Sequence, residues 1–215
     1  MSEQIKALLF DMDGVLIDAK DWHYEALNKA LGLFGLSISR FDHLHTFDGL
    51  PTKVKLQMLS EQYYLPEKLH PFINRVKQSY TQELIATRCR PMYHHEYALS
   101  HFHDAGYKIA VCSNSIRSTI VSMMEHAALM PYIDLIVSNE DVKKAKPDPE
   151  IYQTAMAKFG LKPEECLVVE DNPHGVQAGL ASGAHVLKVA TVFDVNYVNI
   201  FREIHSIKGG EGEND

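Results

Sequence analysis

Two carboxylates, Asp11 and Asp13, stand two residues apart directly after the apolar run Ala7–Phe10. An apolar run of this length is typical of a buried strand, and Gly14 directs the chain into a turn behind it. Two negative charges held this close require a cation or a shared proton. The pair therefore predicts a site that combines a nucleophile, a proton donor and a hard divalent metal ion.

Polar side chains also stand at the ends of later segments that we expect at the same edge of a sheet. They are Ser113 and Asn114 after an apolar run, Lys146 before a predicted helix, and Glu170 and Asp171 after another apolar run. Ligands of open parallel sheets bind beyond the carboxyl ends of the strands. A carboxylate can accept a phosphoryl group, Mg²⁺ prefers oxygen ligands, and lysine and serine can bind phosphoryl oxygens. The set therefore favours phosphoryl transfer.

The elements that must position these residues alternate along the chain. Buried strands are expected at Ala7–Phe10, Lys108–Cys112, Leu135–Val137, Leu167–Val169 and Val186–Val189. Helical patterns separate the later strands, at Ser118–Ala128, Pro149–Phe159 and Gly175–Ala181. This alternation predicts an α/β fold, with a parallel Rossmann-like sheet flanked by helices.

One long segment interrupts the alternation. Residues 17–90 contain no good strand run, and their apolar residues recur at helical spacing. We therefore expect a small α-helical cap domain at 17–90, inserted into a core domain formed by 1–16 and 91–208. The acidic, glycine-rich end at 209–215 is expected to be a disordered tail.

Composition narrows the function classes. The chain has 215 residues, 46% of them hydrophobic, and a net charge of −7, which disfavours nucleic-acid binding. No apolar stretch reaches the length of a bilayer span and no signal peptide is recognisable, so we expect a cytoplasmic protein without membrane contact. Three cysteines without CxxC spacing argue against a disulfide framework or a zinc site. A small phosphorylated metabolite is the expected partner, and no obligate protein partner is inferred.

Four stretches of the chain together carry a family resemblance. They are Asp11–Asp18, Val111–Ser115, Lys146–Tyr152 and Val169–Gly179. In this order they resemble the haloacid dehalogenase-like superfamily of phosphohydrolases, in its subfamily I branch with a small helical cap. Within that branch the chain looks most like the β-phosphoglucomutase-like group, which includes small-metabolite phosphatases and sugar-phosphate mutases.

The resemblance implies roles for three aspartates and a magnesium cofactor. Asp11 would be the nucleophile and a metal ligand. Asp13 would be the general acid and base, and would also offer its backbone carbonyl to the metal. Asp171 would complete the protein ligands of Mg²⁺. An acid two residues after the nucleophile argues for phosphate esters rather than for the dehalogenase or phosphonate-cleaving branches.

The resemblance also implies a set of phosphate-binding residues. Ser113 and Lys146 would hold the phosphoryl group, and Asn114 is grouped with them as a phosphate-binding residue. Glu170 would assist through water or through Lys146. Two simpler interpretations remain open: that Ser113 only turns the chain after its strand, and that Lys146 belongs to a lysine run on a solvated face.

The cap residues leave the choice between phosphatase and mutase open. His23 matches the hinge histidine of the mutases, and Gly49 stands where that group has a glycine-led substrate loop. The mutases carry an arginine three residues after that glycine, where this chain has Thr52, and Lys53 is the nearest substitute. A second basic residue of the cap, expected near Lys77, has no unambiguous match. A phosphatase acting on a small organic phosphate, such as a sugar phosphate, is therefore favoured over a mutase.

Two other function classes and one other kind of metal site are disfavoured by the sequence. A phosphoacceptor signalling domain also uses acids, a hydroxyl and a lysine, but places its phosphorylated aspartate near the middle of the chain. A catalytically silent binding protein is disfavoured by the complete set of acids. Histidines are frequent in one short stretch, at His94, His95, His101 and His103. On a helix His94, His101 and His103 do not share one face, which favours a solvated helix over a transition-metal site.

Overall fold

The computed structural model describes residues 5–47 and 49–209 and divides the chain into two compact units. The core unit contains the residues up to Asp18 and from Arg90 onward, and the helical unit is Ala19–Cys89. That the helical unit acts as a cap stays a prediction. Of the tail predicted at 209–215, Gly209 is the last residue of a helix, and the other residues lie outside the described part of the chain.

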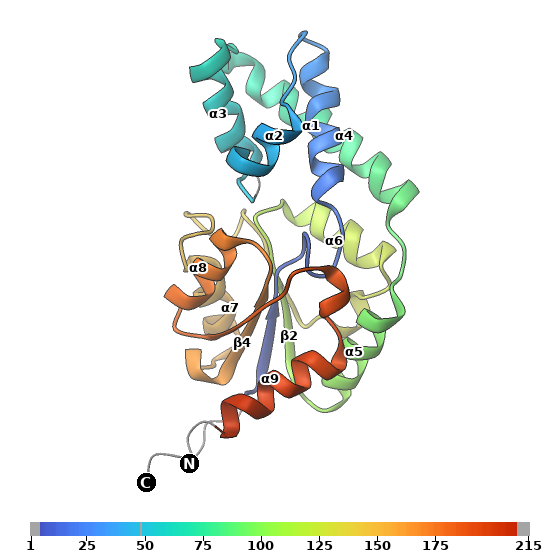
Figure 1. Ribbon diagram of the computed structural model, residues 1–215, viewed down its shortest axis with the longest axis vertical. Coiled ribbons are helices and arrows are strands. Elements are labelled where there is room, and N and C mark those ends of the chain that lie inside the picture. The colour runs from blue at the N-terminus through green and yellow to red at the C-terminus, as the bar shows by residue number, and fades with distance from the viewer. Residues whose placement is uncertain (1–4, 48, 210–215) are drawn as a thin grey trace. The chain divides into compact units, whose positions relative to one another are not determined.

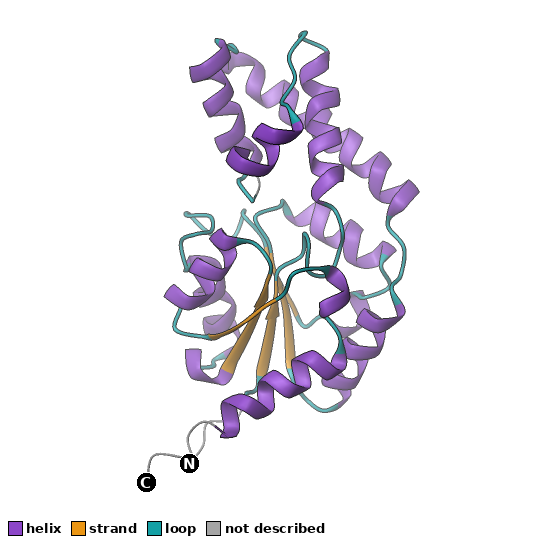
Figure 2. Ribbon diagram, in the orientation of Figure 1, coloured by secondary structure: helices purple, strands orange, loops and turns teal. Residues whose placement is uncertain are grey.

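The core unit is built on five parallel strands, coloured orange in Figure 2, in the order β3-β2-β1-β4-β5. Their bounds are β1 Ala7–Phe10, β2 Lys108–Cys112, β3 Leu135–Val137, β4 Cys166–Glu170 and β5 His185–Lys188. The predicted α/β fold with a parallel sheet is confirmed. Two strands differ slightly from the prediction, because β4 extends by one residue at each end and β5 begins and ends one residue earlier.

Helices cover both faces of this sheet, which explains why its central strand is apolar throughout. All four residues of β1 are fully buried, as expected for a parallel strand covered on both sides. Helix α7 packs against β2 and β3, and α8 against β4 and β5. On the other face α9 crosses the strands, and α5 lies beside it (Figure 1). The core helices are α5 Tyr93–Asp104, α6 Arg117–His126, α7 Glu150–Phe159, α8 Pro173–Ala181 and α9 Tyr197–Gly209.

The expectation of a solvated histidine-rich helix is wrong for one residue of α5. His95 is only 1% exposed, and its Nε2 lies 2.8 Å from the carbonyl oxygen of Val192. His101 and His103 are exposed as expected. His95 points inward because it lies on the face of α5 that also buries Leu99 and Phe102.

The helical unit has its own core and contains no strand among its described residues. Its α-helices are α1 Lys20–Gly32, α2 Arg40–Asp42, α3 Thr52–Tyr63 and α4 His70–Arg88, with a short π-helix at His43–Phe47. Leu31 of α1, Leu59 of α3 and Ile73 of α4 belong to one buried cluster. Packing of three amphipathic helices around this cluster gives the unit a hydrophobic core.

Two expectations from composition can be compared with the structure. Cys89, Cys112 and Cys166, for which no disulfide framework was expected, are all free and buried. No helix within 5–47 and 49–209 has both the length and the apolar character needed to cross a bilayer.

Candidate active site

Lys146 lies at the centre of the predicted site. Its Nζ donates to Asp11 Oδ1 at 2.7 Å, to Glu170 Oε1 at 2.6 Å and to the carbonyl oxygen of Cys112 at 2.9 Å. Its side chain is 5% exposed and that of Glu170 only 1%. One buried ammonium group therefore joins the carboxyl ends of β1, β2 and β4, where the sequence predicted functional side chains.

The electrostatics of this cluster favour an additional positive charge. Burial, followed by the negative charge of Glu170, raises the pKa of Asp11 well above its usual value, and Lys146 offsets only part of that rise. Burial alone would lower the pKa of Lys146, but Asp11 and Glu170 outweigh it and hold that pKa above its usual value. Lys146 is thus held in its charged form. Its single positive charge does not balance the negative charge of the carboxylates around it.

Glu170 is held on both of its carboxylate oxygens. Oε1 accepts the phenol of Tyr152 at 2.7 Å in addition to Lys146. Oε2 accepts the backbone amides of Asp171 at 3.1 Å and Asn172 at 3.4 Å. The Tyr152 ring also lies under the ammonium group, with 4.8 Å from Nζ to the ring centroid. Glu170 is therefore a fixed anchor for Lys146.

Tyr152 was not singled out by the sequence analysis. It lies in the first turn of α7 and is fully buried, and burial raises the pKa of its phenol well above the usual value, with Glu170 adding to the rise. A buried tyrosine hydroxyl needs a polar partner. The signal was its position within the matched stretch Lys146–Tyr152, but the partner could not be named from the sequence.

Three carboxylates form a cluster that could hold a metal ion. One oxygen each of Asp11, Glu170 and Asp171 lies within 4.8 Å of the others, and all three residues are buried. Carboxylate oxygens are the donors that Mg²⁺ prefers, so the donor set fits the predicted cofactor. The cluster includes Glu170, which was predicted only as a supporting residue. It does not include the side chain of Asp13, for which the prediction was a backbone carbonyl ligand.

Asp13 is positioned by a tight turn behind β1. The amides of Leu16 and Ile17 both donate to the carbonyl of Met12 at 2.9 Å, and the amide of Gly14 donates to the carbonyl of Ile17 at 2.7 Å. Gly14 has a φ of +89°, a conformation that side chains with a Cβ rarely adopt. These hydrogen bonds fix the backbone of Met12 and Gly14, the two residues that flank Asp13. They therefore hold Asp13 on the same edge of the sheet as Asp11.

Ser113 and Asn114 continue the site from β2. The buried Ser113 Oγ accepts the amide of Ser115 at 3.1 Å, which is also the bond expected if this serine turns the chain. Ser115 Oγ lies 3.5 Å from Asp13 Oδ2, a neighbour that the sequence analysis did not identify. Asn114 Oδ1 accepts the backbone amide of Lys146 at 3.1 Å, so this side chain fixes the lysine segment. A phosphate-binding role for Ser113 and Asn114 stays a prediction.

The remaining predicted residues belong to the helical unit. Gly49 has a φ of +72° in the loop before α3, and Lys53 is an exposed residue in the first turn of α3. Lys77 Nζ of α4 lies 3.2 Å from His23 Nδ1 of α1. The structure thus pairs His23 with the lysine for which the sequence gave no unambiguous role.

Comparisons with known proteins bear on the family and the fold of this chain. A family model described as haloacid dehalogenase-like hydrolase matches residues 8–189. The phosphorylated carbohydrates phosphatase of Thermotoga maritima is 25% identical over 207 residues, which cover 96% of this chain and 89% of that protein. A probable pseudouridine-5′-phosphatase of Saccharomyces cerevisiae is 31% identical over 196 residues, covering 86% and 82%. The crystal structure of β-phosphoglucomutase from Clostridium difficile superposes with a TM-score of 0.83 at 22% identity, covering 96% of this chain and all of that one, a likeness of fold.

Proposed function

Because the chain belongs to the haloacid dehalogenase-like hydrolase family, we propose that it is a magnesium-dependent phosphatase that hydrolyses a small organic phosphate monoester. The observation that carries this proposal is the contact of Lys146 Nζ with Asp11 Oδ1 at 2.7 Å and with Glu170 Oε1 at 2.6 Å. A buried cation beside a carboxylate at a strand end suits the binding of a phosphoryl group next to its nucleophile. The phosphatases among the relatives support a phosphate ester, such as a sugar phosphate, as the substrate.

In the first half-reaction Asp11 attacks phosphorus in line with the leaving oxygen. The bond between the Asp11 carboxylate oxygen and phosphorus forms as the bond from phosphorus to the leaving oxygen breaks. Asp13, protonated at this stage, donates its proton to the leaving oxygen, so that an alcohol departs. Lys146 balances the charge of the transferring group, and Ser113 binds one of its oxygens.

In the second half-reaction the phosphoaspartate is hydrolysed. Asp13, now a carboxylate, takes a proton from a water molecule as that water attacks phosphorus. The bond between phosphorus and Asp11 breaks, inorganic phosphate leaves, and Asp13 holds the proton needed for the next cycle. Ser115, whose Oγ is 3.5 Å from Asp13 Oδ2, is placed to orient this carboxyl group.

Asp11 and Asp171 would hold the magnesium ion, together with the backbone carbonyl of Asp13. When bound, the ion neutralises negative charge on the phosphoryl group and on the carboxylates around it. The raised pKa of Asp11 supports this requirement, because Lys146 alone does not offset the burial of that carboxyl group and the negative charge of Glu170. An ionised nucleophile needs that additional positive charge.

A β-phosphoglucomutase-like mutase is the second candidate. The contact between His23 and Lys77, with 3.2 Å between Nδ1 and Nζ, favours it, because it gives the helical unit a basic residue beside the histidine that matches the hinge histidine of the mutases. Thr52, which stands where the mutases carry an arginine, favours the phosphatase. A mutase must keep its phosphoaspartate from water until the sugar reorients.

A screen of phosphate monoesters that records both free phosphate and isomerised sugar phosphates tests the proposal. Asp11→Asn should abolish phosphate release, while Asp18→Asn, a matched change at an exposed aspartate of the same segment, should retain it. Phosphate release that survives in Asp11→Asn would refute the nucleophile. Isomer formation primed by a bisphosphate, with little free phosphate, would establish the mutase instead.

Phosphorylation by acetyl phosphate separates the enzyme from a signalling domain. Acetyl phosphate should phosphorylate Asp11 only transiently if the protein is a phosphatase. A long-lived phosphoprotein that turns over no substrate would indicate a phosphoacceptor domain, and no phosphorylation at all would indicate a silent binding protein.

A further inference from the structure

Asn139 stands two residues after β3 and joins that strand end to the loop formed by residues 113–115 after β2. Its side-chain Nδ2 donates to the backbone carbonyl of Asn114 at 2.9 Å. Its backbone amide donates to the carbonyl of Ser115 at 3.2 Å. A backbone carbonyl only accepts hydrogen bonds, so the nitrogen of the Asn139 side chain must face it. Asn139 is half-buried, and the proposed reaction does not use it.

The contact with Asn114 leads to Lys146. Asn139 holds the backbone carbonyl of Asn114, while Asn114 Oδ1 accepts the backbone amide of Lys146 at 3.1 Å. Asn114 is therefore held at both its backbone and its side chain. Because Lys146 Nζ lies 2.7 Å from Asp11 Oδ1, a displacement of Asn114 would disturb the segment that carries the buried ammonium group.

The contact with Ser115 leads to the predicted acid and base. Ser115 Oγ lies 3.5 Å from Asp13 Oδ2, and the amide of Ser115 donates to Ser113 Oγ at 3.1 Å. Asn139 holds the carbonyl of this same residue. The 113–115 loop is therefore attached to the end of β3 at two successive residues, between the serine predicted to bind phosphate and the serine beside Asp13.

The segment that presents Asn139 is itself held in place. Asp141 Oδ2 accepts the amide of Ser138 at 2.8 Å and its hydroxyl at 2.7 Å, and Ser138 is fully buried. Arg117 Nη2 donates to both carboxylate oxygens of Asp141, at 2.9 and 2.7 Å. Because Arg117 is the first residue of α6 and follows the 113–115 loop closely, this ion pair joins the two segments a second time. Asn139 is thus presented by a fixed backbone.

We propose that Asn139 is a positioning residue that holds the 113–115 loop in the conformation that binds the phosphoryl group. It acts through Asn114 and Ser115 and is not itself expected to touch the substrate. The inference rests on the proposed function in assigning phosphate binding to Ser113 and Lys146.

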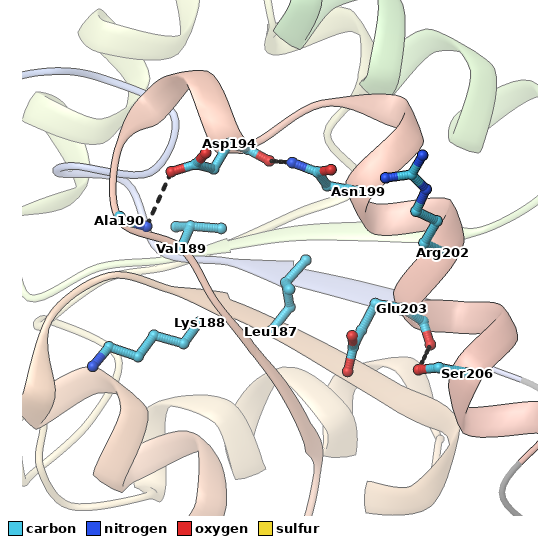
Figure 3. Close-up of a pocket in the computed structure, with 9 residues that line it drawn as sticks. All are labelled: Leu187, Lys188, Val189, Ala190, Asp194, Asn199, Arg202, Glu203 and Ser206. Carbon is cyan, nitrogen blue, oxygen red and sulfur yellow. Dashed lines mark hydrogen bonds between the residues drawn. The ribbon is translucent and has the colours of Figure 1, made fainter.

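Asn199 of α9 provides a matched control. It is also a half-buried asparagine, and its Nδ2 also donates to a backbone carbonyl at 2.9 Å, that of Asp194. Figure 3 shows this bond beside a groove of about 520 Å³ between β5 and α9, whose lining residues are not those of the predicted site. Alanine removes the same chemical group at either position, so a difference between the two variants reports where the group was.

Amide hydrogen exchange of the loop is the direct test, and it needs no substrate. In Asn139→Ala the amides of Ser115 and Lys146 should exchange about fivefold faster, the effect of losing one net hydrogen bond. Asn199→Ala should leave both amides unchanged. Equal protection of these amides in folded Asn139→Ala and in the unaltered protein would overturn the proposal.

A second measurement needs no variant, so it stands even if Asn139→Ala fails to fold. In NMR spectra of the unaltered protein, one side-chain amide proton of Asn139 should exchange slowly and show cross-peaks to Asn114. Side-chain amide protons that exchange at the rate of an exposed asparagine would contradict the contact.

Inhibition by inorganic phosphate distinguishes positioning from simple stabilisation. A loss of folded protein removes active molecules and does not change the affinity of those that remain. With the substrate found in the screen, Asn139→Ala should raise the inhibition constant of inorganic phosphate about fivefold, whereas Asn199→Ala should leave it unchanged. An unchanged constant in Asn139→Ala would refute the positioning role. If the unaltered protein turns over no substrate, the proposed function fails, while the exchange result still decides whether Asn139 holds the loop.

Discussion

Replacing Gly175 by alanine should disrupt the Glu170 anchor. Gly175 is the third residue of α8, and a Cβ built on it would stand 1.8 Å from Glu170 Oε1, 2.0 Å from Cδ and 2.3 Å from Oε2. An ordinary contact is about 3.4 Å, so the carboxylate would have to retreat by about 1.5 Å. Its bonds to Lys146 and Tyr152, at 2.6 and 2.7 Å, cannot survive a shift of that size.

The magnitude follows from the two opposing effects of the substitution. Breaking a buried, hydrogen-bonded ion pair costs about 3–5 kcal/mol. Alanine in place of glycine within a helix raises the free energy of unfolding by up to about 1 kcal/mol. We therefore expect Gly175→Ala to lower the free energy of unfolding by about 2–4 kcal/mol and to abolish phosphate release, because Lys146 loses its anchor.

Urea unfolding followed by far-UV circular dichroism measures this change, and Gly32→Ala is its control. A Cβ on Gly32, the last residue of α1, would meet nothing within 4 Å, so this variant should change the free energy of unfolding by less than about 1 kcal/mol. In a Glu170→Ala background, where the obstructing carboxylate is absent, Gly175→Ala should add little further cost. A Gly175→Ala protein as stable and active as Gly32→Ala, or strictly additive effects in the double variant, would refute the reasoning.

Three further outcomes are expected. Tyr152→Phe should lower the free energy of unfolding by about 2 kcal/mol, the value of a buried hydrogen bond to a charged group, whereas Tyr64→Phe at a 90% exposed ring should have almost no effect in the same urea titration. Burial lowers the pKa of His95 to about 4, so the unfolded chain binds the extra proton and stability is lost as pH falls from about 6.5 towards 4. Between pH 7.5 and pH 5 the unaltered protein should therefore lose about 2 kcal/mol more than His95→Gln, and equal losses would contradict the buried neutral ring. Mg²⁺ at about 100 times its Kd should raise the free energy of unfolding by about 2.7 kcal/mol, an effect that chelation reverses and that Asp171→Asn should greatly reduce.

The strands could be predicted because of how a parallel sheet is built. Its strands are buried on both faces, so each one is a short, continuous apolar run between polar residues. Ala7–Phe10 and Lys108–Cys112 were predicted with the bounds observed, whereas the ends of the edge strand β5 moved by one residue. The inward orientation of His95 could not be predicted, because the α5 pattern gave no sign of a partner from the segment before α9.

The sequence alone identified which residue types stand at the strand ends, because side chains after an apolar run are held at the carboxyl edge of the sheet by strand geometry alone. Only the tertiary structure decided how those residues pair. Lys146 was one lysine in a run, and it was distinguished from its exposed neighbours Lys143 and Lys144 by burial against Asp11, 135 positions earlier in the chain. Contacts such as Tyr152 and Gly175 with Glu170 depend on how α7 and α8 are rotated against the sheet. That rotation is set by packing over the whole core and has no local signature in the sequence.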